Sequence, residues 1–401
     1  MKKIVSMILT VAMAVGAAFA FGGCSSSESG DSSSSDFKVG AIYINSQNDT
    51  SGYTYAHHHG LTLAMEECGL DAANDLYIVD NVPEDDEQVK AAIDQLAGQG
   101  CDIIFGISFG YLNAMSEKAE EYPDIIFSHA TGYLSNDTNF NNYFGRIYQA
   151  RYLAGIAAGY KTLETGNDNV GYVAAWGTEY AETCSGINAF AMGVLSVNSA
   201  AQVYVNQIST WGDQELERQA AEVLVDTYGC GVIAQHCDSS QPQLVAEEKG
   251  VYGCGYNSDM TSEAPNSHLT APIWNWNAYY ATAIKAAMED PANFMTNVGN
   301  YYEGLNSGLV DISELSANNA PEAAEAIEIA RELMTSGQWD VFSGVKLAFA
   351  GEAGSIEAVQ YDDDLVAKGG DVIVEAGGAS VDDSVIQGSM NYYVEGVVPV
   401  N

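Results

Sequence analysis

The chain has 401 residues and is strongly acidic, with 54 Asp and Glu residues against 14 Lys and Arg residues and a formal net charge of −40 at pH 7. Such a surface repels nucleic acid and anionic lipid headgroups, so the composition excludes a nucleic-acid-binding protein. The hydrophobic content of 47% predicts a well-packed globular protein, and the length favours two domains over a single core.

The first 23 residues have the pattern of a secretory signal peptide. Lys2 and Lys3 precede an apolar run over residues 4–21, and two glycines then lead into Cys24. No stop-transfer pattern follows, so the run is not interpreted as a membrane span. The Phe-Gly-Gly-Cys motif resembles a bacterial lipobox, which predicts lipid attachment at Cys24, with a plain cleaved signal as the alternative. The Ser-rich residues 24–36 predict a flexible tether, so we expect the protein to be held by lipid at the outer face of the cell membrane.

From residue 37 onward, segments with strand and helix periodicity alternate in two series. The first series predicts strands at 38–44, 75–82, 102–107 and 124–129 and helices at 54–68, 84–98 and 112–121. Asn, Tyr and Gly break the pattern near 141–146. The second series predicts strands at 169–175, 201–208, 231–235, 251–256 and 268–272 and helices at 148–161, 183–197, 213–227, 239–249 and 276–288. Repeated strand–helix units predict an α/β fold with two doubly wound parallel-sheet lobes and a ligand cleft between them.

The break and the later return of the chain predict the lobe boundaries. We expect residues 37–145 plus about 271–312 in the first lobe, and residues 146–270 plus about 313–345 in the second. The hinge is expected near 143–146 and 272–276. Residues 346–401 are expected to form a C-terminal tail that packs on the lobes.

Residues with binding chemistry follow the predicted strands, where open α/β sheets place their ligands. The candidates combine aromatic rings with single carboxylates and imidazoles, and none is Lys or Arg: Tyr53, Phe109, His129, Trp211, His236, Asp238, Asp259, Trp274 and Trp276. This mixture is typical of a site for a flat, neutral, hydrogen-bonding ligand that lies between rings. No dinucleotide fingerprint, phosphate loop or HExxH motif occurs, so we expect neither a cofactor nor a metal.

Two other motifs suggest different functions. The sequence Gly106-Ile107-Ser108-Phe109-Gly110 matches the nucleophile elbow GxSxG, and with Asp259 and His268 it leaves a secreted α/β hydrolase as the alternative. The run His57-His58-His59 suggests metal binding, but consecutive helical residues point ~100° apart and do not converge on one ion. We expect His57 to face the cleft instead. The six other Cys residues fit small buried hydrophobic positions, with a single disulfide left open.

Several motifs together resemble the basic membrane protein family of ABC-transporter substrate-binding lipoproteins, which includes purine-nucleoside receptors. The motifs are Ser108-Phe109-Gly110-Tyr111, Phe127-Ser128-His129-Ala130-Thr131-Gly132, Tyr152-Leu153-Ala154-Gly155, Gly186-Ile187-Asn188-Ala189-Phe190, Gln235-His236-Cys237-Asp238-Ser239, Ser258-Asp259 and Trp339-Asp340-Val341-Phe342-Ser343-Gly344. The resemblance implies a type I periplasmic-binding-protein fold that closes on its ligand by hinge motion. It also implies an ABC-transporter permease as partner and no enzymatic activity.

The resemblance assigns roles to individual residues. Tyr53 takes the place of an aromatic residue that stacks on the base in the nucleoside-binding branch, and Asp259 matches an Asp that holds the ribose hydroxyls. Trp274 stands where that branch has a sugar-contacting Lys, which favours ring contact over sugar contact. Similarity to a subgroup with Ser-Phe-Gly-Tyr, His-Ala-Thr-Gly and Gln-His-x-Asp-Ser implies a purine base such as adenine, with a nucleoside or another neutral heterocycle as the alternative.

Overall fold

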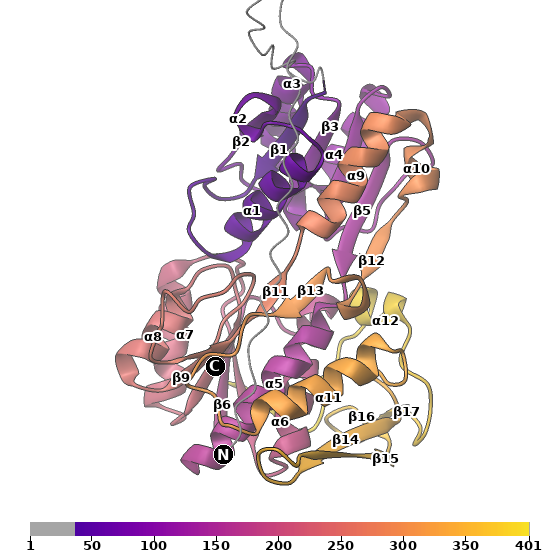
Figure 1. Ribbon diagram of the computed structural model, residues 1–401. Coiled ribbons are helices and arrows are strands. Elements are labelled where there is room, and N and C mark those ends of the chain that lie inside the picture. Colours follow the sequence, from indigo (N-terminus) through magenta and orange to yellow (C-terminus); the bar gives the residue numbers. More distant parts are fainter. Residues whose placement is uncertain (1–36, 401) are drawn as a thin grey trace, which may run out of the picture. The chain divides into compact units, whose positions relative to one another are not determined.

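Six parallel strands form the first sheet of the computed structural model, which describes residues 37–400 (Figure 1). In spatial order they are β12 (Tyr301–Glu303), β5 (Phe140–Gly145), β4 (Ile126–Ala130), β3 (Ile103–Ile107), β1 (Val39–Tyr43) and β2 (Leu76–Val79). The helices of this first lobe are α1 (Gly52–Glu67), α2 (Ala72–Asp75), α3 (Asp86–Gly98), α4 (Leu112–Glu121), α9 (Asn277–Glu289) and α10 (Phe294–Asn297). Because β12 and the last two helices come from a distant part of the sequence, the returning chain completes the lobe.

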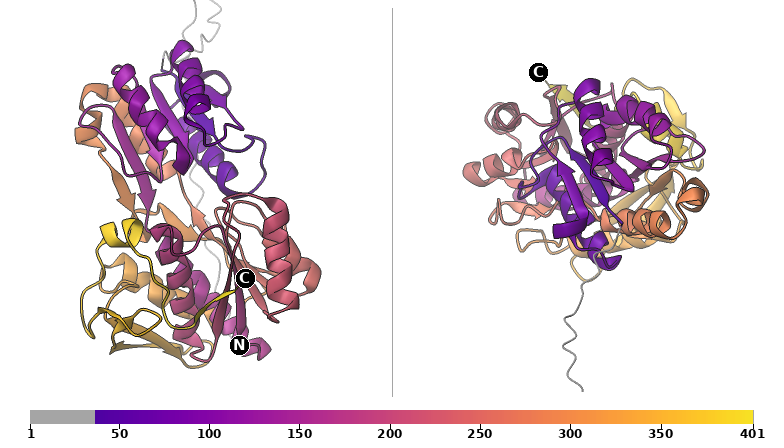
Figure 2. Two further views of the ribbon diagram at one scale, coloured as in Figure 1. Left: turned by 180° about the vertical axis from the view of Figure 1, so that it is seen from behind. Right: turned by 90° about the horizontal axis from the view of Figure 1, so that it is seen from above.

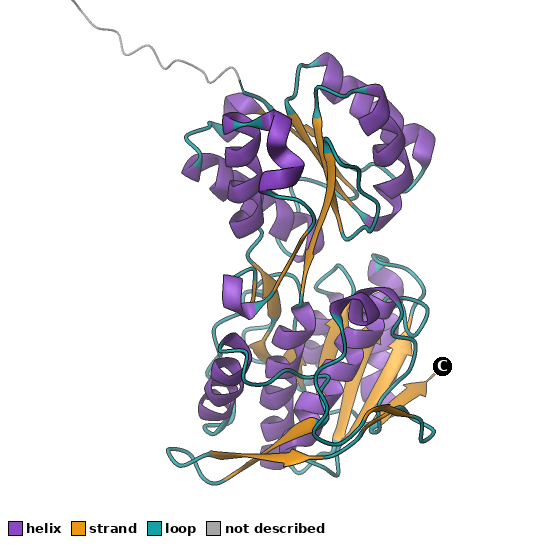
Figure 3. Cartoon of the chain, turned by 90° about the vertical axis from the view of Figure 1, so that its right-hand side faces the viewer, coloured by secondary structure: helices purple, strands orange, loops and turns teal. Residues whose placement is uncertain are grey.

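Successive side chains of the central strands enter different hydrophobic clusters. Val39 and Ala41 on β1 pack in the cluster that includes α1 and α9, whereas Ile42 packs with α3 and α4. Ile104 on β3 likewise joins the second cluster, while its neighbours Ile103 and Phe105 join the first. Helices therefore cover both faces of the sheet, as Figure 3 shows. Because both faces are buried, the strand sequences are continuous apolar runs.

A second sheet of six parallel strands forms the other lobe. In spatial order the strands are β10 (His268–Thr270), β9 (Tyr252–Cys254), β8 (Val232–His236), β6 (Asn169–Ala174), β7 (Gln202–Gln207) and β18 (Val397–Val400). Its helices are α5 (Ile147–Thr165), α6 (Ala181–Val197), α7 (Gln214–Asp226) and α8 (Gln241–Lys249). Tyr172 on β6 packs with α5 and α6, and the next residue, Val173, packs with α7 and α8. This sheet is therefore also doubly wound.

Helices α5 and α6 pack with their backbones in direct contact. A Cβ atom added to Gly155 on α5 would lie 2.2 Å from the carbonyl oxygen of Phe190, and one added to Gly193 on α6 would lie 2.2 Å from that of Tyr152. No side chain larger than hydrogen fits at either position. The two glycines therefore set the distance between the helices.

Three segments cross between the lobes. The first joins β5 to α5 at Arg146, the second runs from β10 through β11 (Pro272–Trp274) to α9, and the third joins β12 to β13 (Val310–Ile312). Strands β11 and β13 pair antiparallel, and the amide of Arg146 donates to the carbonyl of Glu303 at 2.7 Å. All three crossings are therefore linked by backbone hydrogen bonds.

Two sequence predictions at these crossings were wrong. Residues 141–146 were predicted to break the pattern, but 140–145 form strand β5. Its polar side chains are buried with partners: the Asn141 amide donates to the Tyr279 hydroxyl at 3.0 Å. The predicted strand at 268–272 is divided into β10 and β11, and Pro272, which has no N–H to donate, begins the second piece.

The C-terminal region returns to the second sheet. After α11 (Ala323–Thr335), the strands β14 (Val345–Ala350) and β15 (Glu357–Asp362) form an antiparallel pair, as do β16 (Leu365–Val366) and β17 (Val372–Val374). Helix α12 (Asp383–Gly388) follows, and β18 then pairs in parallel with β7. Figure 2 shows this segment in yellow, from α12 to the C-terminal end.

The predicted signal peptide, Cys24 and the Ser-rich tether lie outside the described residues. Six of the seven Cys residues lie within them, and all six are free thiols. Between residues 37 and 400, no helix combines the length and the apolar character that crossing a bilayer requires.

Candidate functional site

The carboxyl ends of strands from both sheets, with the loops after them, enclose a cavity of about 720 Å³. Aromatic rings from both lobes line it, among them Tyr53, Phe109, Phe144, Tyr180, Trp211 and Tyr256. None of the described residues that line the cavity is Lys or Arg. Of the nine predicted ligand-binding residues, the structure brings five together here: Tyr53, Phe109, Trp211, His236 and Asp238.

The first lobe contributes the loops after β1 and β3. The Tyr53 hydroxyl is buried without a hydrogen-bond partner among the described residues, and its ring meets His57 edge-on at 4.5 Å. After β3, the Ser108 hydroxyl and the Gly110 amide both donate to one carboxylate oxygen of Glu84, at 2.6 and 2.8 Å. Glu84 thereby holds the turn that presents Phe109.

The second lobe contributes an aromatic cluster. Trp211 lies 5.7 Å from Tyr180 and 6.2 Å from Trp176 between ring centres. The loop that carries Trp211 ends at Asp213, whose carboxylate accepts from the amides of Glu215 and Leu216 and caps α7. Phe109 of the first lobe meets Tyr180 edge-on at 5.8 Å, so rings from both lobes meet at the cavity.

A polar group lies beside this cluster, at the end of β8. His236 Nε2 lies 3.2 Å from Glu182 Oε1, and the Arg151 guanidinium lies 3.9 Å from the Tyr256 ring centre. Burial and the nearby Arg151 charge lower the pKa of His236. Burial opposes ionisation of Glu182, but His236 and Arg151 hold its pKa below the usual value. The pair is therefore an anionic carboxylate beside a neutral imidazole whose Nδ1 has no partner among the described residues.

Asp238 is the second carboxyl group of this wall. Burial raises its pKa well above the usual value, and the negative charges of Glu217, Glu84 and Glu182 raise it further. Asp238 also lies where the lobes meet, because a Cβ atom added to Gly52 of α1 would lie 2.0 Å from its carbonyl oxygen. A protonated carboxyl group offers one donor and one acceptor side by side.

His129 lies behind the cavity wall and not in it. Its side chain is fully buried, and Nε2 lies 2.9 Å from the carbonyl oxygen of Ser108. Burial lowers its pKa to about 4, despite hydrogen bonds that act in the opposite direction. The neutral ring therefore supports the turn that carries Phe109, and the structure does not show it at the ligand surface.

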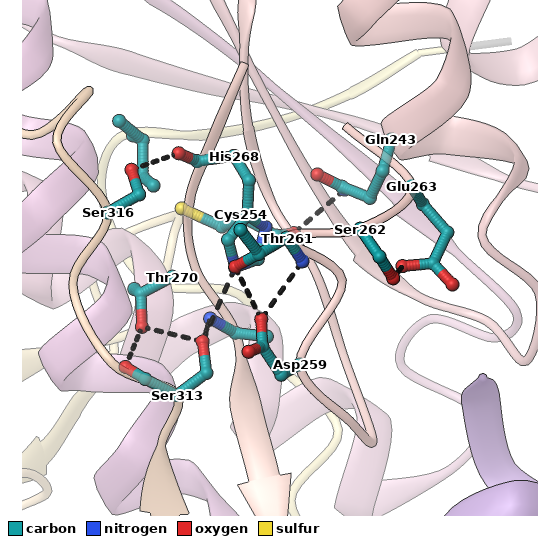
Figure 4. Close-up of polar contacts among 12 residues, drawn as sticks. Gln243, Cys254, Asp259, Thr261, Ser262, Glu263, His268, Thr270, Ser313 and Ser316 are labelled. Carbon is teal, nitrogen blue, oxygen red and sulfur yellow. Dashed lines mark hydrogen bonds and ion pairs between the residues drawn. The ribbon is translucent and has the colours of Figure 1, made fainter. Parts of the chain in front are cut away.

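Asp259 was predicted in the cleft but does not line it. Strand β9 ends at Cys254, so Tyr256 lines the cavity, and Asp259 lies further along the loop. Its carboxylate accepts from the amide and hydroxyl of Thr261 at 2.9 and 2.6 Å and lies 3.5 Å from His268 Nε2 (Figure 4). Neither Asp259 nor His268 lines the cavity that Ser108 lines, so the triad of the hydrolase alternative is not assembled.

Trp274 and Trp276 were also predicted at the ligand surface, and both lie in the core. Their rings stack at 4.3 Å, and Trp276 stacks on His57 at 4.2 Å on its other side. The expectation that His57 faces the cleft is therefore wrong as well. His57 Nδ1 pairs with the Tyr280 hydroxyl at 2.7 Å, so this stack joins α1 to α9 inside the first lobe.

Sequence reasoning missed the loop between β6 and α6 and the first turn of α6, which contribute Glu179, Tyr180 and Glu182 to the cavity. The signal was present, because Trp176-Gly177 begins two residues after Ala174, where the strand ends, and obeys the same strand-end rule as the other loops. A second missed group comes from α12, which lines the cavity with Ser384 and Gln387. No local pattern marks these two residues.

The family model described as ABC transporter substrate-binding protein PnrA-like matches residues 37–339. A putative ABC transporter glucose-binding protein of Haloferax volcanii is 34% identical over 312 residues, which cover 78% of this chain and 75% of that protein. A purine-binding protein of Brucella abortus is 33% identical over 307 residues, which cover 77% of this chain and 83% of that protein. These matches confirm the family resemblance inferred from the motifs.

Solved structures share the architecture. An ABC transporter solute-binding protein of Aeropyrum pernix aligns with a TM-score of 0.64 and 15% identity, over 79% of this chain and 94% of that one. A transcriptional activator of the comK gene from Bacillus halodurans aligns with a TM-score of 0.62 and 19% identity, over 75% of this chain and 99% of that one. At these identities the likeness concerns the fold alone, and it confirms the two-lobed type I periplasmic-binding-protein fold.

Proposed function

Because this chain belongs to the PnrA-like family of ABC transporter substrate-binding proteins, we propose that it captures a purine, with the free base adenine as the leading ligand. Closure of the lobes holds the ligand until a membrane permease receives it. Lipid attachment at Cys24 holds the protein at the outer face of the membrane, close to that permease.

The composition of the cavity wall carries this proposal. Rings approach from both lobes, and each stacked ring contributes ~0.5–1.5 kcal/mol beyond burial. The polar groups between them are neutral or anionic, and none of the described lining residues supplies a positive charge. A flat neutral heterocycle meets both conditions, whereas a phosphate group would face Glu179 and Glu182 without a cation to bind it.

Asp238 supports adenine over guanine. A protonated carboxyl group donates through its O–H and accepts through its C=O. The adenine edge presents a ring nitrogen that accepts and an amino group that donates, so the two match. The Watson–Crick edge of guanine presents adjacent donors and fits an ionised carboxylate better. The raised pKa of Asp238 thus favours adenine over guanine.

A purine nucleoside is the second candidate. The cavity of about 720 Å³ is larger than two fused rings require, since it has room for about 24 water molecules at ~30 Å³ each. Its lining also includes Asn142, whose Oδ1 has no hydrogen-bond partner among the described residues and can accept from a hydroxyl group. The purine-binding relative agrees with either ligand, and the relative named for glucose makes that sugar the necessary competitor.

Calorimetric titration of the tether-free protein with adenine, guanine, hypoxanthine, adenosine, AMP and glucose tests the proposal. We expect adenine to bind, AMP not to bind, and Trp211→Ala to weaken adenine binding by about tenfold, the factor that ~1.4 kcal/mol of lost contact produces. The matched control is Tyr361→Ala, which removes an exposed ring on β15, outside the cavity. Tight binding of AMP, or of glucose without any purine, would overturn the proposal.

A further inference from the structure

Helix α12 lies beyond the part of the chain that matches the family, yet it lines the ligand cavity. The match ends at residue 339, whereas Ser384, Gln387 and Gly388 belong to the lining. These positions are three and four residues apart and therefore share one face of the helix. Ile386, on the other face, is 1% exposed. The helix thus has a buried face and a cavity face.

Contacts on both sides hold α12 in place. The Arg146 guanidinium donates to both carboxylate oxygens of Asp383, at 3.0 and 2.6 Å, in the bidentate geometry that fixes orientation as well as distance. Arg146 also lies 5.3 Å from the Tyr302 ring centre. Its backbone joins two of the crossings between the lobes, so Asp383 fastens α12 to the hinge.

The segment after α12 is clamped to the second lobe. The Asn188 side chain on α6 donates to the carbonyl of Tyr392 at 2.8 Å and accepts from the amide of Val394 at 3.0 Å. The buried Met390 side chain lies 3.4 Å from the same Asn188 amide. With the hinge on one side and α6 on the other, α12 presents Gln387 to the cavity from a rigid support.

Helix α12 lies on the β12 side of the cavity, away from Tyr53. Arg146 and Tyr302 place it beside β12, an edge strand of the first sheet, while Tyr53 follows β1, four strands away in the same sheet. At ~4.8 Å between neighbouring strands, the four steps from β12 to β1 amount to about 19 Å. A base that contacts Tyr53 and Trp211 does not reach α12. A substituent carried by that base would extend from it toward α12.

We propose that α12 is a ligand-specificity element, in which Gln387 contacts the hydroxyl-bearing part of a purine nucleoside and Asp383 positions the helix through Arg146. This inference rests on the proposed function for the choice of ligand and extends it to the nucleoside. Amide side chains donate and accept at once, which matches ribose hydroxyls. Asn142 Oδ1, which has no partner among the described residues, adds an acceptor in the same cavity.

Titration of matched variants with adenosine and adenine tests the inference. Gln387→Trp fills the α12 end and is expected to weaken adenosine binding by about tenfold, with adenine binding kept within about threefold. Ser389→Trp places the same ring on an exposed residue outside the lining and is expected to change neither. Asp383→Asn is expected to weaken adenosine but not adenine, a selective effect that general destabilisation does not produce. Thermal unfolding of each variant checks that it is folded.

Three results would overturn the inference. The first is a wild-type protein that binds adenine but not adenosine, and the second is the same adenosine affinity for Gln387→Trp and Ser389→Trp. The third is a Gln387→Trp variant in which the affinities for adenosine and adenine fall by the same factor. If the wild-type protein binds neither adenine nor adenosine, the proposed function is wrong, and a separate measurement then tests the inference about α12. The compound released from the denatured wild type is then identified by mass spectrometry. Gln387→Trp must retain less of it than Ser389→Trp, and equal retention would exclude α12 from the site.

Discussion

At the scale of single residues, two carboxyl groups with similar sequence settings have different environments. Asp238 and Asp259 each follow a strand of the second sheet. Asp238 lines the cavity between the lobes, where burial and neighbouring negative charges raise its pKa. The Asp259 side chain is 56% exposed and lies beside His268. Only Asp238 therefore has a position from which it can contact a ligand in the cavity.

The raised pKa of Asp238 predicts that adenine affinity depends on pH. Under the proposed function the protonated form pairs with adenine, so we expect binding to be full below the pKa that Asp238 has in the folded protein and to fall as the pH rises through it. Asp238→Asn keeps one donor and one acceptor, so we expect it to bind adenine with little pH dependence. Asp238→Ala is expected to lose about tenfold in affinity. Titrations across a pH series measure all three.

Asp259→Ala is the matched control for this series, because it removes a carboxyl group outside the cavity. It should show wild-type affinity and a wild-type pH profile. An affinity for adenine that rises with pH in the wild-type protein would contradict the assigned protonation state.

At the scale of elements, the contact between α5 and α6 depends on glycine. Gly155→Ala would place a Cβ atom 2.2 Å from the Phe190 carbonyl oxygen, so the helices must move apart. Such overpacking costs ~1–3 kcal/mol, which exceeds the gain in helix propensity of up to ~1 kcal/mol. We expect denaturant titration to show a lower free energy of unfolding for this variant.

Gly98→Ala makes the comparison specific. Gly98 is also a helical glycine, but no atom lies within 4 Å of its added Cβ. Alanine there keeps only the propensity gain, so the variant should be neutral or slightly more stable. Equal stability of the two variants would show that α5 and α6 do not pack as tightly as the structure indicates.

At the scale of the whole molecule, contacts across the cavity join the lobes. The Gly52 amide of α1 donates to the Ser258 hydroxyl at 3.1 Å, and Gly52 has φ +84° and no room for a side chain against Asp238. A larger residue at this position meets both backbone strain and a clash with the second lobe. We therefore expect Gly52 to be needed when the lobes close on a ligand.

Small-angle scattering with and without saturating adenine tests closure. We expect the wild-type radius of gyration to decrease on binding, because capture between lobes requires hinge motion. Gly52→Ala should neither contract nor keep wild-type affinity. Gly69→Ala is the control, since Gly69 has φ +75° but open space around it, and it should contract normally. Superimposable wild-type profiles would count against closure.

The sequence by itself determined the class of fold, because apolar periodicity is local and parallel strands require covering helices. It also predicted that Tyr53, Phe109, Trp211, His236 and Asp238 lie together, since loops after parallel strands meet at one edge of a sheet, and all five line the cavity. Tertiary structure alone decided the rest. Trp276 lies in the core because a stacking partner, His57, lies on α1. Asp259 lies outside the cavity because β9 ends at Cys254, several residues before it. Gln387 reaches the cavity through a bidentate ion pair between Arg146 and Asp383, residues far apart in sequence, and a contact between such distant residues leaves no local pattern in the sequence.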